Sequence, residues 1–276
     1  MLIKYGYLGP VGTFTEAALQ RIASSDDRLI AYANVTAALD AVRKGDCQKA
    51  LVPIENSVEG VVARTLDELA IGEPLVITQE VTLPVTFALL TLPGTDPKNI
   101  KSIATHPHAE SQCRSFIAKN YPTAQIIETP STAAAAKGLA NKDYEAAIAG
   151  VNAAKNYNLK IITEDIGDNQ AAVTRFVVVE KPGRVIAPTG KDRTSLAVFI
   201  AIDHAGALLE ILNEFAKHQV NLTFIQSRPT GSQLGHYHFI IDAEGHIEDA
   251  PISAALAGLK QICEDIRFLG SYPQAK

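Results

Sequence analysis

The chain has 276 residues, of which 47% are hydrophobic and 20% are charged. These fractions lie close to the averages for globular proteins and exclude disorder, collagen and coiled coil as overall classes. The 25 Lys and Arg residues are outnumbered by 30 Asp and Glu residues, which gives a formal net charge of -5 without a basic tract. We therefore expect no general surface for nucleic acid and none for an anionic membrane.

The N-terminal segment and the cysteines favour a cytoplasmic protein. Residues 1–10 lack the apolar run and the small-residue cleavage pattern of a signal peptide. The best apolar run, 196–202, is far shorter than the about 20 residues that cross a membrane. Cys47, Cys113 and Cys263 are odd in number and far apart, so we expect reduced packing residues and no disulfide or zinc knuckle.

The first two thirds of the chain alternates β-branched runs with Ala-rich stretches, which is typical of an α/β domain with largely parallel strands. Strands are expected at 4–8, 29–33 and 50–53, and helices from Thr13 and over 57–70. The sequence Thr13-Phe-Thr-Glu16 is a capping box, because Thr13 can accept from a backbone N–H and Glu16 can reach back. A long apolar stretch, 75–92, is interrupted at Pro84, which marks a crossing point between two lobes.

The same pattern then repeats and implies a second, similar lobe. Strands are expected at 100–104, 125–128, 145–149, 161–164 and 173–180, and helices at 107–119 and 132–140. We therefore predict an N-terminal domain at 1–182, with one lobe formed by 1–78 and 164–182 and the other by 79–163. Two Pro and two Gly between residues 181 and 190 place a linker at 183–193.

Beyond the linker the order of elements changes. Strands are expected at 194–202, 221–227, 237–242 and 266–269, and helices at 207–218 and 251–264. The resulting order, βαββαβ, is that of a split ferredoxin-like domain, which we assign to residues 194–272.

Short polar clusters follow strands or open helices, where free backbone N–H groups and the helix dipole favour an anion. They are Thr13, Glu55-Asn56-Ser57, Thr105-His106, Ser131-Thr132 and Thr174-Arg175. Ligands of two-lobed α/β domains bind at the carboxyl ends of strands, between the lobes, so we expect a small carboxylate as the ligand. Each Ser or Thr taken singly is explained as well by an ordinary helix cap, and only the set is informative.

Neither a cofactor nor a metal is expected. Gly6-Tyr-Leu-Gly9-Pro-Val-Gly12 follows a strand, but its spacing differs from the dinucleotide-binding fingerprint. No phosphate-binding Walker lysine motif is present either. The pairs His106-Pro-His108 and His236-Tyr-His238 lack a nearby Cys or carboxylate triad, which favours solvent-facing histidines over metal ligands.

Several motifs, in the right order along nearly the whole chain, resemble those of the prephenate dehydratases. They are Tyr7–Thr15, Pro53–Gly60, His106–Cys113, Ser131–Ala135 and Asn169–Phe176, the last of which ends in Thr-Arg-Phe. The C-terminal part resembles the ACT regulatory domain of that family through Gly206–Leu209 and Asn221–Pro229. The expected fold is thus α/β, a two-lobed periplasmic-binding-protein-like catalytic domain followed by a ferredoxin-like ACT domain.

This resemblance implies the conversion of prephenate to phenylpyruvate in L-phenylalanine biosynthesis, with loss of carbon dioxide and water. Aromatisation drives the reaction without a metal or redox cofactor, so the protein must hold two carboxylates and assist the departing ring hydroxyl. The resemblance makes Thr174 the residue that contacts this hydroxyl. We hypothesise that Glu55, if burial raises its pKa, provides or relays the proton. An ordinary ion pair between Glu55 and Arg175 explains these two residues equally well.

The resemblance and the polar clusters together give a set of substrate-binding candidates. They are Thr13, Asn56, Ser57, Thr105, Gln112, Ser131, Thr132, Arg175 and Phe176. A core position explains Phe176 better than a place in the site. Arogenate as the substrate, a catalytically silent amino-acid sensor and a solute-binding protein are the alternatives to the leading interpretation.

For the ACT part, the resemblance implies that L-phenylalanine binds between the ACT domains of two subunits in a homodimer or homotetramer. The expected effector residues are Gly206, Ala207, Leu208, Leu209, Asn221, Leu222, Gln226, Ser227, Arg228 and Pro229. Two positions depart from the family pattern, since Gln226 replaces the usual Glu and Ala205 the usual Pro. Gln keeps hydrogen-bonding capacity without charge, so we expect effector binding but leave its strength and sign open.

Overall fold

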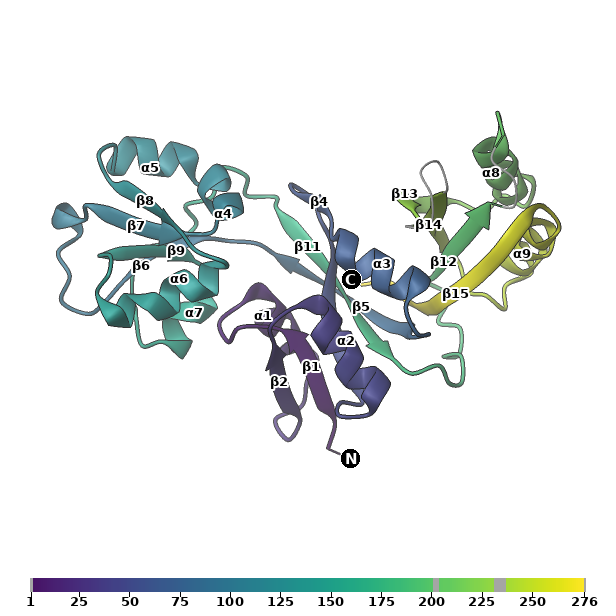
Figure 1. Ribbon diagram of the computed structural model, residues 1–276, viewed down its shortest axis with the longest axis horizontal. Helices are drawn as coiled ribbons and strands as arrows, with labels where there is room; N and C mark the ends of the chain where they lie inside the picture. The colour runs from purple at the N-terminus through teal and green to yellow at the C-terminus, as the bar shows by residue number, and fades with distance from the viewer. Residues whose placement is uncertain (1, 201–203, 231–236, 276) are drawn as a thin grey trace. The chain divides into compact units, whose positions relative to one another are not determined.

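The computed structural model describes residues 2–200, 204–230 and 237–275. The chain forms two compact units. The first comprises Met1–Ala38, Leu51–Val62 and Thr82–Phe176, and the second comprises Leu39–Ala50, Ala63–Val81 and Val177–Lys276. The described strands belong to three sheets, which can be followed by their labels in Figure 1.

The first sheet has the order β2-β1-β3-β11-β5. Its strands are β1 (Lys4–Leu8), β2 (Arg28–Tyr32), β3 (Lys49–Asn56), β5 (Val76–Pro84) and β11 (Val173–Glu180), and its helices are α1 (Phe14–Leu19), α2 (Val35–Lys44) and α3 (Ala63–Ile71). A short strand, β4 (Gly60–Val61), folds back on β3, so that Asn56 lies opposite Gly60. Because β11 is inserted beside β3, residues far apart in the sequence meet where these two strands adjoin.

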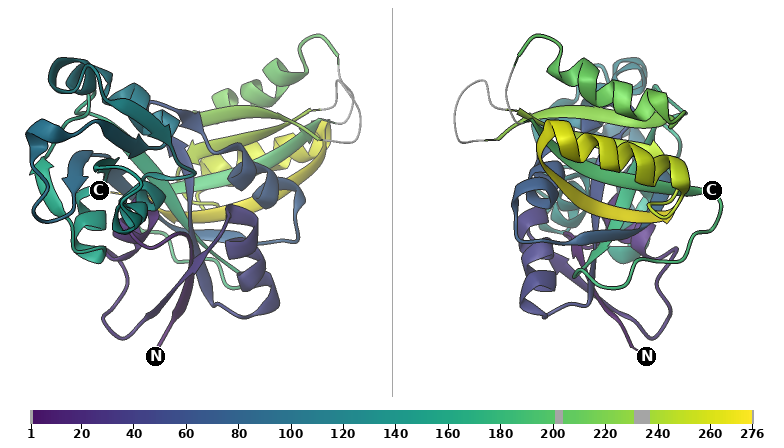
Figure 2. Two further views of the ribbon diagram at one scale, coloured as in Figure 1. Left: turned by 60° about the vertical axis from the view of Figure 1, so that its left-hand side comes forward. Right: turned by 90° about the vertical axis from the view of Figure 1, so that its right-hand side faces the viewer.

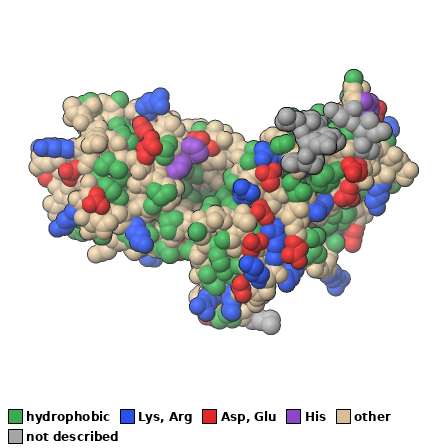
Figure 3. All heavy atoms as spheres, in the orientation of Figure 1, with side chains coloured by type: hydrophobic (Ala, Val, Ile, Leu, Met, Phe, Trp, Pro, Cys, Tyr) green, Lys and Arg blue, Asp and Glu red, His purple; other side chains and the backbone are tan. Residues whose placement is uncertain are grey.

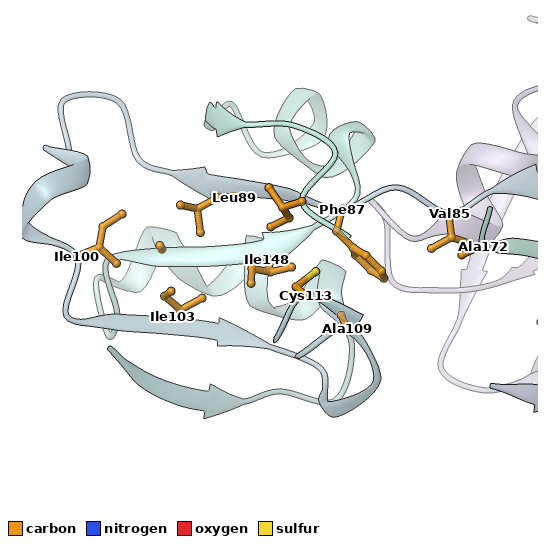
Figure 4. Packing of buried hydrophobic residues seen from close by; sticks show 11 residues of the cluster. Val85, Phe87, Leu89, Ile100, Ile103, Ala109, Cys113, Ile148 and Ala172 are labelled. Carbon is orange, nitrogen blue, oxygen red and sulfur yellow. The ribbon is translucent and has the colours of Figure 1, made fainter. Parts of the chain in front are cut away.

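The second sheet has the order β10-β6-β9-β7-β8. Its strands are β6 (Ala88–Thr91), β7 (Ser102–Thr105), β8 (Gln125–Glu128), β9 (Ala146–Ala149) and β10 (Lys160–Thr163), and its α-helices are α4 (Pro107–Gln112), α5 (Arg114–Asn120), α6 (Thr132–Gly138) and α7 (Val151–Asn156). Strand β7 runs parallel to β8 and β9, whereas β6 runs antiparallel to β9 and β10. Apolar side chains of these elements form the core in Figure 4, where Phe87, Leu89 and Ile148 are labelled.

The same core cluster reaches into the two segments that connect the lobes. Val85 and Ala172 belong to it, and the Val85 N–H donates to the Ala172 carbonyl at 2.8 Å. The chain thus crosses to the second lobe after Pro84 and returns before β11, next to its outgoing path. This confirms the two-lobed α/β arrangement that the sequence predicts.

The third sheet has the order β13-β14-β12-β15. Its strands are β12 (Asp192–Ile200), β13 (Leu222–Pro229), β14 (Tyr237–Glu244) and β15 (Cys263–Pro273), and its helices are α8 (Ala207–Lys217) and α9 (Ala250–Ile262). Both helices lie on one face of the sheet in the right-hand view of Figure 2. Phe215 and Leu259 pack there against Leu196 and Ile241. The order βαββαβ confirms the ferredoxin-like prediction, although residues 201 and 202 of the predicted first strand lie outside the described residues.

Two local predictions are wrong, and two helices were not predicted. No helix spans 57–70, because Gly60 takes a positive φ of 84° and the chain forms a turn and β4 before α3 begins at Ala63. Helices α2 and α7 were not predicted. In the capping box, Thr13 caps α1 as predicted, but the Glu16 carboxylate accepts from Gly12 N–H at 2.6 Å instead of from Thr13.

Further predictions concern cysteines, membranes and domain limits. All three cysteines are free thiols, with Cys47 and Cys113 buried. Among the helices of the described residues, none is both long and apolar enough to cross a bilayer. The limits 1–182, 183–193 and 194–272 stay predictions.

Candidate functional site

The end of β3 and the start of β11 bring the amide of Asn56 to the hydroxyl of Thr174. Asn56 Oδ1 accepts from the backbone N–H groups of Val58 and Glu59 at 2.8 and 2.9 Å. Because both of these partners are donors, the other end of the amide must be the NH₂ group. Asn56 Nδ2 donates to Thr174 Oγ1 at 2.8 Å.

This contact decides what the Thr174 hydroxyl can do. Its oxygen already accepts a hydrogen bond, so its own hydrogen is directed away from Asn56 and is available to a further acceptor. Thr174 is only 8% exposed. The hydroxyl is therefore an oriented donor in a largely water-excluded place, where such a donor has a stronger effect than in bulk water.

Glu55 and Arg175 lie beside this pair. Arg175 Nη1 is 3.6 Å from Glu55 Oε2, which is the ion pair that the sequence analysis left open. The Arg175 side chain is 8% exposed, whereas that of Glu55 is 39% exposed. The burial on which the proton-relay hypothesis for Glu55 depends is thus only partial in this structure, while Arg175, the residue after Thr174 in β11, is a buried cation.

Ser57 does not open a helix, and the prediction of a helix start there is wrong. Its N–H donates to the Val173 carbonyl at 2.9 Å, and its Oγ accepts from the Val173 N–H at 3.0 Å. These two bonds fasten the turn after β3 to the first residue of β11. Ser57 therefore fixes the register in which Asn56 and Thr174 meet.

Thr13 caps α1 and its hydroxyl is engaged on both sides, because Oγ1 donates to the Leu8 carbonyl and accepts from Glu16 N–H. The buried Glu16 carboxylate also accepts from the Tyr7 hydroxyl and from Asn156 Nδ2, at 3.2 and 2.9 Å. Burial and the Glu16 charge raise the pKa of Tyr7 above its ordinary range, so its hydroxyl stays a donor.

Asn152 of α7 and Tyr157, the residue after α7, bind the loop that precedes α1. Neither residue was predicted to belong to the site. Asn152 Nδ2 donates to the Thr13 carbonyl at 3.0 Å, and the Tyr157 hydroxyl donates to the Val11 carbonyl at 2.6 Å. A six-residue helix shows too little periodicity to be found from the sequence.

Thr105 and Phe176 are both buried, and their assignment as substrate-binding residues stays a prediction. Thr105 is fully buried, and its hydroxyl donates to the Ile148 carbonyl at 2.9 Å. Phe176 is 1% exposed and is a core residue, as its alternative interpretation predicted. In α6, Ser131 is the N-cap, with Oγ accepting from Ala134 N–H at 3.0 Å, and Thr132 begins the helix.

Gln112 binds Glu59, a residue that was not predicted to belong to the site. Gln112 Nε2 donates to Glu59 Oε1 at 3.0 Å, and His108 Nε2 lies 3.6 Å from Glu59 Oε2. The side chain of His108 is 64% exposed, as predicted, whereas His106 is half-buried. Histidine and acidic side chains lie next to each other near the start of α4 on the face shown in Figure 3. No group of His, Cys, Asp and Glu in the described ranges is arranged to hold a metal ion.

The prediction for the other histidine pair is wrong at His238. His238 was predicted to face solvent but is fully buried on the third sheet, stacked on Phe199 with ring centroids 5.0 Å apart. Burial lowers its pKa, so the neutral ring is favoured. His236 lies outside the described residues.

The predicted effector residues form two groups. One lies at the start of α8, and the other lies at the start of β13 and along it. Gly206 precedes α8 with a positive φ of 100°, Ala207 is buried, and Leu208 and Leu209 are exposed. Along β13, the even-numbered residues from Leu222 to Arg228 are half-buried, whereas Asn221, Ser227 and Pro229 are exposed.

Two side chains of this effector set have defined partners. Gln226 Nε2 donates to the Ser227 carbonyl. Arg228 is engaged with the helix α3, because Nε and Nη2 each donate at 2.8 Å to one carboxylate oxygen of Asp67.

Comparison with protein families and with curated proteins agrees with this geometry. The family model described as prephenate dehydratase matches residues 5–184, and the ACT domain model matches residues 194–261. The prephenate dehydratase of Amycolatopsis methanolica is 43% identical over 273 residues, which cover 99% of this chain and 89% of that protein. The prephenate dehydratase of Mycobacteroides abscessus is 42% identical, covering 97% of this chain and 89% of that protein.

Solved structures give the same result. A prephenate dehydratase from Arthrobacter aurescens in complex with L-Phe is 48% identical, has a TM-score of 0.94 and covers 99% of this chain and 90% of its own. A structure described as a quorum quenching acylase is 27% identical, with a TM-score of 0.87 and coverage of 98% and 97%. The chain belongs to the prephenate dehydratase family and carries an ACT domain in its C-terminal part.

Proposed function

We propose that this protein converts prephenate to phenylpyruvate and that the Thr174 hydroxyl donates to the departing ring hydroxyl. The observation that carries the proposal is the hydrogen bond from Asn56 to Thr174 Oγ1, which leaves the Thr174 hydrogen for the substrate. A donor already oriented before the reaction stabilises the developing charge without reorganising at the transition state.

The charges around Thr174 suit a dianionic substrate. Arg175 follows Thr174 in β11 and is buried, and a buried guanidinium binds a carboxylate strongly by charge-assisted hydrogen bonds. We propose that one substrate carboxylate binds Arg175. It competes there with the carboxylate of Glu55, whose Oε2 lies 3.6 Å from Arg175 Nη1. Displacement of Glu55 from Arg175 by the substrate would free Glu55 to take up a proton from solvent and to pass it to the departing hydroxyl, which then leaves as water. Thr13, Ser131 and Thr132, at two helix starts, stay candidates for the second carboxylate.

The test is a turnover assay with prephenate near neutral pH, with formation of phenylpyruvate measured against the uncatalysed rate. Thr174→Val should lower kcat about 10²–10⁴-fold without loss of folding, and Thr174→Ser, which keeps the hydroxyl, should retain part of the activity. Near-normal turnover by Thr174→Val would remove Thr174 from the mechanism. An unchanged pH–rate profile in Glu55→Gln would exclude the relay.

The same assay separates the alternative functions. No turnover of prephenate but turnover of arogenate would make arogenate the substrate. No turnover of either compound would favour an amino-acid sensor. Because a structure described as an acylase has a similar fold, an assay of acylase activity is a useful control.

We infer that L-phenylalanine is the effector and that it binds between the ACT domains of two copies in a homodimer or homotetramer. Two observations support this. The Arthrobacter aurescens relative is a complex with L-Phe, and β13, which carries the effector residues, is an edge strand of its sheet. We also propose that the enzyme acts in the cytoplasm, as expected for amino-acid biosynthesis.

A further inference from the structure

We propose that Glu59 is a positioning residue, which couples helix α4 of the second lobe to the Thr174 hydroxyl through the turn that follows β3. The inference rests on the proposed function, because it assigns Glu59 to the same reaction. Glu59 itself is not placed at the reacting atoms. It acts through Asn56.

The first step is the contact between Glu59 and α4. Both carboxylate oxygens face this helix, one accepting from Gln112 Nε2 at 3.0 Å and the other lying 3.6 Å from His108 Nε2. Gln112 is 8% exposed, so its amide is held firmly, and the Glu59 side chain is 30% exposed. A hydrogen bond to an ionised carboxylate is stronger than one between neutral groups. The Glu59 side chain is therefore anchored on α4.

The second step is the backbone of Glu59. Its N–H donates to Asn56 Oδ1 at 2.9 Å, next to the bond from Val58 N–H. The strand pairs Glu55–Val61 and Asn56–Gly60 close the turn on the other side. In so short a turn, a shift of Glu59 moves both backbone donors that orient the Asn56 amide.

The third step leads to the reacting group. Asn56 Nδ2 donates to Thr174 Oγ1 at 2.8 Å, so the direction of the Thr174 hydrogen depends on the orientation of the Asn56 amide. The path runs from α4 through Glu59 and Asn56 to Thr174, and each link is a hydrogen bond or a covalent connection. An error of about 1 Å in the position of a catalytic group can lower a rate about 10²-fold.

A carboxylate that only shaped the substrate-binding surface would act differently. Glu59 is an anion near a site proposed for a dianionic substrate, so direct contact with substrate would be repulsive. Removal of such a repulsive group would lower KM. Removal of a positioning group lowers kcat, because the hydroxyl is misdirected in the transition state.

The experiment compares Glu59→Ala and Glu59→Gln with the wild type in the turnover assay. We expect Glu59→Ala to lower kcat about 10- to 100-fold with little change in KM. Glu59→Gln should restore most of the activity, because its amide oxygen can still accept from Gln112. Glu164→Ala, a matched change at an exposed residue, is the control and should leave kcat unchanged.

Amide hydrogen exchange at Val58 and Glu59 provides a readout that does not need turnover. The proposal predicts faster exchange at position 58 in Glu59→Ala, at an unchanged thermal midpoint. Wild-type kcat in Glu59→Ala, a change in KM alone, or unchanged exchange would each overturn it. If the wild type converts neither prephenate nor arogenate, the proposed function fails, and the exchange measurement still decides whether Glu59 holds the turn.

Discussion

Asn56 shows how a single side chain can determine the chemical role of another. Its carbonyl oxygen accepts two backbone N–H groups, so its NH₂ group has to face Thr174. A hydroxyl can donate or accept, and here Asn56 leaves the Thr174 hydroxyl the donor role that the proposed mechanism requires. The amide thus makes the Thr174 hydroxyl a directed donor.

We predict that Asn56→Asp will separate the two functions of this amide. An Asp carboxylate can still accept from the Val58 and Glu59 N–H groups, but it would draw the Thr174 hydrogen toward itself and away from substrate. The expected result is a fall in kcat of about 10²-fold or more with a nearly unchanged thermal midpoint. Wild-type kcat in Asn56→Asp would show that Asn56 does not orient Thr174. Asn56→Ala removes the hydrogen bonds of the turn as well, so its thermal midpoint measures how much they stabilise the fold.

At the same scale, the sequence predicted the two residues of the proposed catalytic contact better than the residues around them. The motifs pointed to Asn56 and Thr174, which are 118 positions apart and do meet. Glu59 could not be identified in this way, since its role depends on a contact with α4 that no local pattern encodes. The inward orientation of Thr105 could not be predicted either, because a β-branched polar residue at a strand end can turn either inward or outward.

Among the elements, the long β-branched strands and the ferredoxin-like order were predictable, and the short or interrupted elements were not. Strand β11 was predicted with its observed limits, because its run of Val has strong β propensity. The predicted helix over 57–70 failed because the Asn56 side chain satisfies the N–H groups of the turn, which competes with helix formation. Helix α2 was omitted although Val35, Leu39 and Val42 follow a helical period.

Helix α3 is one of the elements outside the ACT sheet that form hydrogen bonds with it. Arg228 of β13 forms two hydrogen bonds with Asp67 near the middle of α3. Arg267 of β15 donates to the carbonyls of Leu69 and Gly72, where the last carbonyls of a helix lack internal partners. Helix α3 begins directly after β4, so the helix held by the ACT arginines continues from the turn that carries Asn56.

We therefore predict that Asp67→Asn will weaken the response of the enzyme to L-phenylalanine. Arg228 belongs to the predicted effector segment, and loss of its charged partner should reduce the coupling between effector and turnover about fivefold or more. Without effector, kcat should stay within about twofold of wild type, and stability should change by about 1 kcal/mol or less, as for other partly exposed ion pairs.

The measurement for this variant is the dependence of turnover on L-phenylalanine concentration. Asp40→Asn is a matched control, because Asp40 also pairs with an arginine, Arg43 in α2. An unchanged response in Asp67→Asn, or an equal change in the control, would contradict a role for the Asp67 pair in regulation.

At the scale of the whole molecule, the ACT sheet ends in an edge strand with exposed apolar side chains. β13 is at one end of the order β13-β14-β12-β15. Ile225 on this strand is 44% exposed, and Leu209 at the start of α8 is 60% exposed. Natural proteins seldom leave an edge strand with apolar residues in water, because it invites pairing with another chain. A second copy of the chain, paired along β13, would cover this edge.

This pairing predicts that self-association and effector binding are lost together. Ile225→Asp places a charge in the paired edge, so sedimentation velocity should show a smaller species than the wild type, and equilibrium dialysis should show weakened L-phenylalanine binding. Turnover in the absence of effector should persist, because Ile225 lies on the ACT sheet and outside the Asn56–Thr174 contact. Val151→Asp introduces the same charge at an exposed residue of α7 and should change neither property. An oligomer of wild-type mass in Ile225→Asp would place the subunit interface elsewhere, and a smaller species that binds L-phenylalanine normally would confine the effector site to one chain.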